Sequence, residues 1–287
     1  MKRFLKEVFF FLSIPMLYFL VIGFINYQYS KNQKPILQNS QVIFMGDSHM
    51  QAALNPEDWQ GSVNMAQSAE PYVLTYWKLK EFIKYNKIDT VFLSLSYHNL
   101  SGFNDLKFSH PRWSAEMFKR SYLMPELKMF NDIPFDKSSY YRVLWKQYCI
   151  FPKQNHIYFL GNFTPHKSSD FLTVPLTLNR HFYNHSKTHD VSKFSINYFN
   201  QIIELADSNN IKLIVVCPPI NKVYSNEVPE KFVNAFDDLV LKSKQKGVHV
   251  LNYTNLNLED SYYKDGDHLN LEGSKKLYEE IRKDLKN

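Results

Sequence analysis

The sequence predicts an α/β fold in three layers, with a doubly wound sheet of five parallel strands between helices. Two observations lead to this prediction. Five short apolar runs of strand length lie after residue 40, and amphipathic helical patterns separate them. Alternating strands and helices are typical of parallel sheets that carry helices on both faces. The first run is also continuously apolar, as expected for a strand that is buried on both sides.

The amino-terminal half supplies three of the strands and one helix. Residues 42–45 form a continuous apolar run, and residues 62–65 form a shorter strand candidate. Between residues 71 and 85, apolar side chains recur at three- and four-residue spacing, which predicts an amphipathic helix. Residues 90–95 (TVFLSL) give the third strand.

The carboxyl-terminal half supplies the other two strands, at residues 212–217 and 248–251. Helices are expected at residues 196–207, 231–245 and 271–285, so the alternation continues to the end of the chain. This order predicts a flavodoxin-like sheet, in which ligands bind beyond the carboxyl ends of the strands.

The first 29 residues predict a membrane anchor. Lys2, Arg3 and Lys6 precede residues 8–27, a run of twenty residues without charge. A helix of that length crosses about 30 Å of hydrocarbon. The run has no small-residue cleavage site, so an uncleaved signal anchor is favoured over a signal peptide. Because basic residues stay on the cytoplasmic side, we expect a single-pass protein of the cytoplasmic membrane whose main domain lies outside, in the periplasm or at the cell surface.

Residues 30–39 are polar and predict a linker, and residues 40–287 predict one domain that carries an insert at residues 101–190. The insert is dense in aromatic and basic residues. Because a structureless loop of that length would be unusual, we expect it to form a helical cap beside the site.

Composition argues against several classes of function. Hydrophobic residues make up 44% and charged residues 22% of the chain, which is typical of a folded protein. The net charge is +6, but no Lys/Arg cluster or nucleic-acid-binding module is visible, so we expect no nucleic-acid partner. The two cysteines, Cys149 and Cys217, form no CxxC pair, which argues against a thiolate zinc site.

Three histidines in the insert have a spacing that could hold a metal ion. His181, His185 and His189 recur every four residues and would line one face of a helix. Their segment, RHFYNHSKTHD, is polar and rich in turn-forming residues, which argues against a helix there. We therefore expect neither a metal ion nor a cofactor.

Two polar segments at opposite ends of the domain carry the candidate chemistry. Residues 46–49 (GDSH) follow the first strand directly, and residues 265–268 (DGDH) precede the last helix. Taken by itself, Ser48 is better explained as a helix N-cap than as a nucleophile. However, an Asp three residues before His268 can hold one ring nitrogen and leave the other free to take a proton. If both segments open at one sheet edge, Ser48, His268 and Asp265 can converge.

These segments resemble those of the SGNH (GDSL-type) hydrolase family, and the resemblance covers most of the domain outside the insert. It implies that Ser48 is the nucleophile, that His268 is the general base and that Asp265 orients the base. Asp267, next to His268, is the competing carboxylate.

The resemblance also implies an oxyanion hole with three donors, of which the amide of Ser48 is the first. The second donor belongs to a block that looks like residues 64–69 (NMAQSA), and it would be the amide of Ala69. In this block alanine replaces both glycines of the family pattern, but a backbone donor survives that change.

The third donor of the family is an Asn side chain in a G-x-N-D block directly after the third strand, and here the sequence departs from the pattern. The register puts His98 at the place of that Asn, with Asn99 one position later. Asn104 lies in a GFND stretch that spells the motif but comes about six residues late. Asn99 and His98 are therefore equal candidates for the third donor, and Asn104 ranks after them.

The anchor, the GDSH segment and the Ser-Tyr-His-Asn block resemble exported family members that modify envelope polymers, such as the D-alanyl transfer protein of teichoic acid synthesis and the alginate O-acetylation proteins. This implies a membrane-anchored serine esterase or O-acyltransferase that acts on acyl esters of a carbohydrate or polyol polymer of the cell envelope. A multi-pass membrane acyltransferase is the implied partner. The alternative is a non-catalytic component of an acylation complex that assembles it or binds the polymer. A lipase-like enzyme is a weaker third interpretation.

Overall fold

The structure, a computed structural model, describes residues 1–37, 40–123, 131–150, 157–166, 170–184 and 187–286. The chain divides into two units. One consists of Met1–Lys34 and Lys107–Tyr158, and the other of Pro35–Leu106 and Phe159–Asn287. The expected insert at residues 101–190 is therefore divided between the two units.

The second unit is built on a five-stranded parallel sheet, which confirms the predicted fold class. The strand order is β2-β1-β3-β6-β7. The strands are β1 (Val42–Met45), β2 (Ser62–Asn64), β3 (Thr90–Ser94), β6 (Lys212–Cys217) and β7 (His249–Asn252). From β1 the chain passes to β2 on one side, and then to β3, β6 and β7 on the other. The strand order therefore reverses between β1 and β3, which is where doubly wound sheets bind ligands.

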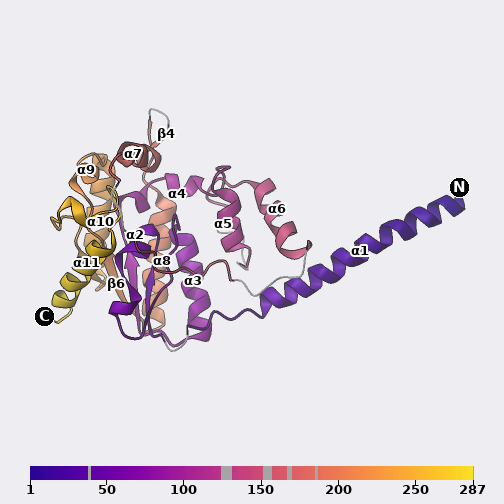
Figure 1. Ribbon diagram of the computed structural model, residues 1–287, viewed down its shortest axis with the longest axis horizontal. Helices are drawn as coiled ribbons and strands as arrows, with labels where there is room; N and C mark the ends of the chain where they lie inside the picture. Colours follow the sequence, from indigo (N-terminus) through magenta and orange to yellow (C-terminus); the bar gives the residue numbers. More distant parts are fainter. Residues whose placement is uncertain (38–39, 124–130, 151–156, 167–169, 185–186, 287) are drawn as a thin grey trace. The chain divides into compact units, whose positions relative to one another are not determined.

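Helices cover both faces of this sheet (Figure 1). One apolar core joins side chains of β1, β3, β6 and β7 to α2 (Ser48–Ala53) and α11 (Leu271–Asp284). The pair formed by α3 (Tyr72–Tyr85) and α8 (Lys193–Ser208) lies on the other side of the strands from α11 (Figure 1). The central strands are buried along nearly their whole length, which explains their continuous apolar runs.

Strand and helix boundaries agree with the sequence prediction to within three residues. The largest difference is α8, which begins at Lys193 rather than at residue 196. Ser192 is the N-cap of this helix, and its hydroxyl accepts a hydrogen bond from the amide of Ser195. The helix α10 (Glu230–Gln245) packs against β7.

Shorter elements complete the second unit. They are η1 (Pro56–Asp58), η2 (Tyr97–Leu100), α4 (Phe103–Leu106), α7 (Val174–Phe182), β4 (Tyr183–Asn184), β5 (Lys187–Thr188), α9 (Lys222–Ser225) and η4 (Asp260–Tyr262).

The described part of the first unit contains α1 (Lys2–Lys31), α5 (Ser114–Ser121) and α6 (Lys137–Tyr148). Among the residues that the structure describes, α1 is the one helix long and apolar enough to cross a membrane, with a mean hydropathy of 2.5 in its most apolar stretch. Most of its apolar side chains are exposed. The helix α6 packs against both α1 and α5.

Candidate active site

The turn after β1 presents Ser48 at the first position of α2. Gly46 has a φ of +136°, and a Cβ at this position would collide with the hydroxyl of Ser94 on β3. Asp47, and not Ser48, is the N-cap of α2, since its carboxylate accepts the amide of His49 at 3.0 Å. The local structure thus decides against the N-cap interpretation of Ser48.

The DGDH segment folds around the carboxylate of Asp265. Its Oδ1 accepts the backbone amides of Asp267 and His268 at 3.1 and 2.8 Å, an arrangement typical of an Asx turn. Gly266 is packed closely here, because a Cβ would lie 2.7 Å from the side chain of Val174. These contacts fix the position of Asp265 relative to the imidazole that follows it.

The two distant segments meet at the carboxyl end of β1. The Nε2 of His268 lies 2.8 Å from the Oγ of Ser48, and its Nδ1 lies 2.9 Å from Oδ1 of Asp265. A hydroxyl, an imidazole and a carboxylate, each within hydrogen-bond reach of the next, have the arrangement that nucleophilic catalysis needs. The structure therefore brings together the three side chains that the sequence singled out.

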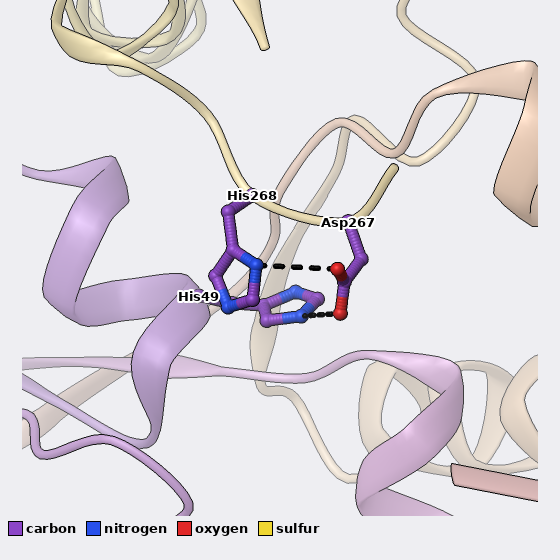
Figure 2. A group of neighbouring side chains, drawn as sticks. All are labelled: His49, Asp267 and His268. Carbon is purple, nitrogen blue, oxygen red and sulfur yellow. Dashed lines mark hydrogen bonds and ion pairs between the residues drawn. The ribbon is translucent and has the colours of Figure 1, made fainter. Parts of the chain in front are cut away.

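Asp267 is a second carboxylate on the same imidazole. Figure 2 shows each of its carboxylate oxygens facing a different histidine: Oδ1 lies 3.2 Å from Nδ1 of His268, and Oδ2 lies 3.2 Å from Nε2 of His49. The other nitrogen of His49 lies 2.9 Å from the hydroxyl of Ser96. His49 and Asp267 are both buried, so Asp267 contacts His268 from the interior of the protein.

The charges of this group act on His268. Burial by itself disfavours the imidazolium, but the charge of Asp267 and the hydrogen bonds to Asp265 and Asp267 outweigh it and raise the pKa of His268 to about 10. Burial would raise the pKa of Asp267, but the charge of His268 and hydrogen bonds from His268 and His49 hold it well below its usual range. The neutral, proton-accepting form of His268 is therefore favoured at alkaline pH.

His98 and Asn99, the two equal candidates for the third oxyanion donor, both point at the carboxylate of Asp47. Oδ2 of Asp47 lies 2.7 Å from Nε2 of His98 and accepts from Nδ2 of Asn99 at 2.6 Å. Burial would raise the pKa of Asp47, but the charge and hydrogen bond of His98, followed by His49 and Asn99, lower it below its usual range. Sequence reasoning missed this role of Asp47, and a donor role for His98 or Asn99 stays a prediction.

The side chain of Asn104 contacts the backbone of the η2 loop. Its Nδ2 lies 2.8, 3.2 and 3.3 Å from the carbonyl oxygens of His98, Asn99 and Ser101, and so it holds the backbone of η2. This side chain stabilises the loop that carries the other two candidates.

The second block runs beside the GDSH turn. The amide of Gln67 donates to the carbonyl of Gly46 at 3.1 Å. The buried Lys78 pairs with Glu70 and donates to the carbonyl of Met65 at 2.7 Å, which fixes both ends of the block. Ala69 has a φ of +59°, a left-handed conformation that is uncommon for a residue with a Cβ. The role of its amide as an oxyanion donor stays a prediction.

A segment after residue 158 lies against these elements, and sequence reasoning did not single it out. The amide of Asn162 donates to the carbonyl of Ala66, and the amide of Thr164 donates to that of Gln51. The ring centroid of His166 lies 6.5 Å from that of His268. Burial, helped by the charges of Lys264 and His268, lowers the pKa of His166 to about 4.

His181 and His189 do not lie on one helix. The helix α7 ends at Phe182, and residues 183–184 and 187–188 pair as short antiparallel strands, while His185 lies outside the described residues. His181 is buried, and its Nδ1 lies 2.7 Å from the hydroxyl of Tyr224. The hydrogen bond to Tyr224, which is distant in sequence, gives buried His181 a structural role.

Two groups in the described part of the chain have metal-ligand spacing: His49, Asp267 and His268, and His98, His181 and Asp267. In the first group, the facing ring nitrogens are at hydrogen-bond distance from the carboxylate. In the second, the rings of His98 and His181 stack with an interplanar angle of 21°. Since nitrogen lone pairs lie in the ring plane, nearly parallel stacked rings do not converge on one ion. The geometry fits a hydrogen-bonded network better than a metal centre.

No protein-family model and no curated protein sequence matches this chain. Similar solved structures include a proposed acylhydrolase from Bacteroides fragilis, at 13% identity and a TM-score of 0.43, covering 90% of this chain and 92% of the other. A GDSL-like lipase from Bacteroides thetaiotaomicron has 13% identity and a TM-score of 0.45, with coverages of 91% and 96%. A proposed platelet activating factor from Streptococcus pneumonia has 14% identity and a TM-score of 0.45, with coverages of 96% and 97%.

Proposed function

We propose that this protein is a serine esterase or O-acyltransferase of SGNH type that forms an acyl-enzyme on Ser48. The observation that carries the proposal is the continuous contact from Ser48 Oγ to His268 Nε2 at 2.8 Å and from His268 Nδ1 to Asp265 at 2.9 Å. Local structure holds two of the three side chains in place: Ser48 begins a helix, and Asp265 is fixed by two backbone amides.

The first half-reaction follows from this geometry. His268 removes the proton from the Ser48 hydroxyl as its oxygen attacks the acyl carbonyl. The amides of Ser48 and Ala69 stabilise the oxyanion that forms, with Asn99 or His98 as the proposed third donor. As the tetrahedral intermediate collapses, the leaving alcohol takes the proton from His268, and the acyl group stays on Ser48.

The second half-reaction repeats these steps with a new acceptor. His268 removes a proton from water or from a sugar or polyol hydroxyl, which attacks the acyl-enzyme. The same intermediate therefore leads to hydrolysis or to transfer, depending on which acceptor reaches the ester.

The proposed setting is the outer side of the cytoplasmic membrane, with α1 as the anchor. The length and hydropathy of α1 support this, as do Lys2, Arg3 and Lys6 at its start, which favour a cytoplasmic amino terminus. The proposed substrate is an acylated carbohydrate or polyol polymer of the cell envelope, and a multi-pass acyltransferase is the proposed partner.

Labelling tests the nucleophile directly. The full chain in detergent is incubated with an activated acetyl ester, and the protein is analysed by intact mass and peptide mapping. We expect an acetyl adduct on Ser48 that is absent in Ser48→Ala and strongly reduced in His268→Gln. An adduct elsewhere, or no adduct on a folded protein, contradicts the proposal.

A second candidate function is a non-catalytic component that assembles an acylation complex or binds its polymer. The engagement of His98 and Asn99 by Asp47 favours it, because the expected third donor is occupied in this structure. If the protein forms no adduct while wild type and Ser48→Ala bind acetylated polymer equally well, this second function holds.

A further inference from the structure

The aromatic helix α6 lies against the carboxyl-terminal half of α1. The ring of Trp145 lies 4.9 Å from that of Phe19, and the ring of Tyr148 lies 6.5 Å from that of Tyr27. Phe19 is well inside the uncharged run of residues 8–27, roughly 12 Å along the helix from Tyr27 at 1.5 Å per residue. One end of α6 is therefore beside the apolar part of α1.

Side chains of α1 satisfy the backbone at this end of α6. The last carbonyl groups of a helix have no intrahelical donor. Here Asn26 donates to the carbonyl of Tyr148, the last residue of α6, at 2.8 Å, and the hydroxyl of Tyr18 donates at 2.7 Å to the carbonyl of Ile150, two residues after the helix. In hydrocarbon, an unpaired carbonyl is strongly disfavoured because no water replaces the lost donor. The donors from α1 therefore allow this end of α6 to enter hydrocarbon without unpaired carbonyl groups at Tyr148 and Ile150.

The outer face of α6 has the composition of a membrane interface. Tyr141 is 65% exposed and Trp145 is 48% exposed, and their four-residue spacing puts them on one helical face. Arg142 and Lys146 are exposed beside them with the same spacing. Aromatic rings with flanking basic residues are typical of the boundary between headgroups and acyl chains.

We propose that α6 is a second membrane-contacting element, whose Tyr141–Trp145 face lies among the acyl chains of the outer leaflet of a phospholipid bilayer while the long side chains of Arg142 and Lys146 extend outward to anionic headgroups. The occupant of this face is lipid, because the face continues the exposed apolar surface of α1 and carries the opposite charge to that of the headgroups. The inference rests on the proposed anchoring by α1 and adds a contact that α1 does not require.

Fluorescence quenching by brominated lipid tests this contact. The full chain is reconstituted in vesicles of phosphatidylcholine and phosphatidylglycerol with bromine near the headgroup or near the chain end. Because Trp145 packs beside Phe19, we expect bromine near the chain end to quench the emission that is lost in Trp145→Phe. The matched control is Trp113→Phe, which removes a tryptophan beside α5 and leaves the α6 face intact, so the quenched component persists.

Two outcomes separate this inference from the anchoring proposal. Retention of the chain in the membrane after alkaline carbonate treatment reports on α1 alone. If the chain is retained but Trp113→Phe and Trp145→Phe are quenched like wild type, the α6 contact is overturned and the anchor stands. If the chain is extracted, the anchor proposal fails.

Headgroup binding has its own readout. Replacement of both Arg142 and Lys146 by Gln should reduce the blue shift of Trp145 emission caused by raising the phosphatidylglycerol fraction, without changing carbonate resistance. An unchanged shift overturns the assignment of these two residues to headgroups.

Discussion

Replacing Asp267 by Asn tests how the neighbouring carboxylates set the pKa of His268. The amide has nearly the shape of the carboxylate but no charge. In the structure, Asp267 lies 3.2 Å from the ring nitrogens of both His268 and His49, and it is buried. The substitution therefore removes a close, poorly screened negative charge and leaves Asp265 in place.

The size of the effect follows from the distance and the burial. An opposite charge this close typically changes a pKa by about one to three units, and each unit corresponds to about 1.4 kcal/mol. Asp267 is the largest of the influences that raise the pKa of His268 to about 10. Without it the imidazolium is less stable, so the pKa of His268 should fall by about one to three units.

The assay is the pH dependence of kcat/KM for an activated acetyl ester, measured with wild type, Asp267→Asn and Glu272→Gln. Loss of activity on the acid side reports protonation of the base in the free enzyme. We expect this acid limb to move to lower pH in Asp267→Asn. Glu272→Gln also removes one carboxylate, but Glu272 is exposed and pairs with Lys275, so its profile should match wild type.

Other charged and titratable groups face His268 and stay unchanged in this comparison. They are Asp265 on its own loop, His49 on α2, and His166. An acid limb that stays in place in a folded Asp267→Asn protein would refute the reasoning, because it would mean that the charge of Asp267 does not reach the base.

The remaining predictions concern the nucleophile, the turn, a nearby histidine and acid stability. Ser48→Ala should lower kcat/KM by at least about a thousandfold with unchanged circular dichroism, and residual turnover near wild type would exclude an acyl-enzyme on this residue. Gly46→Ala should destabilise the fold by about 2 kcal/mol or more in urea titrations, because its Cβ would collide with Ser94 at a φ that L-residues avoid; an unchanged midpoint would contradict this. His166→Gln should leave the shape of the pH profile above about pH 6 unaltered, because the pKa of His166 is already lowered to about 4 and the ring is neutral there. The pKa of Asp47 is lower in the folded protein than in the unfolded chain, so the stability that its carboxylate contributes is present above about pH 4 and is lost as the pH falls. In urea titrations, the free energy of unfolding of Asp47→Asn should therefore depend less on pH below about pH 4 than that of wild type. The same pH dependence in both proteins would count against the pairing of Asp47 with His98 and Asn99.

Most of the fold could be predicted because its signals are local. Each central strand is a short run of apolar residues, and each long helix shows apolar spacing on one side, so neighbouring residues alone determine these elements. The start of α8 was missed by three residues because an N-cap depends on one hydroxyl, that of Ser192, reaching one amide. The spacing of apolar residues does not show which hydroxyl reaches which amide.

The sequence by itself determined the alternation of five strands with helices along the chain and the long apolar helix at the amino terminus. It also identified Ser48, His268 and Asp265 as candidate catalytic residues. The tertiary structure decided that these three side chains meet, that Asp47 rather than Ser48 caps α2, and that Asp267 is shared by two histidines. It also turned His98 and Asn99 toward Asp47 and paired residues 107–158 with α1 in one unit. The physical reason is that spacing along a chain limits which residues can approach, whereas the partner that each polar side chain takes depends on backbone torsions and on packing from distant segments.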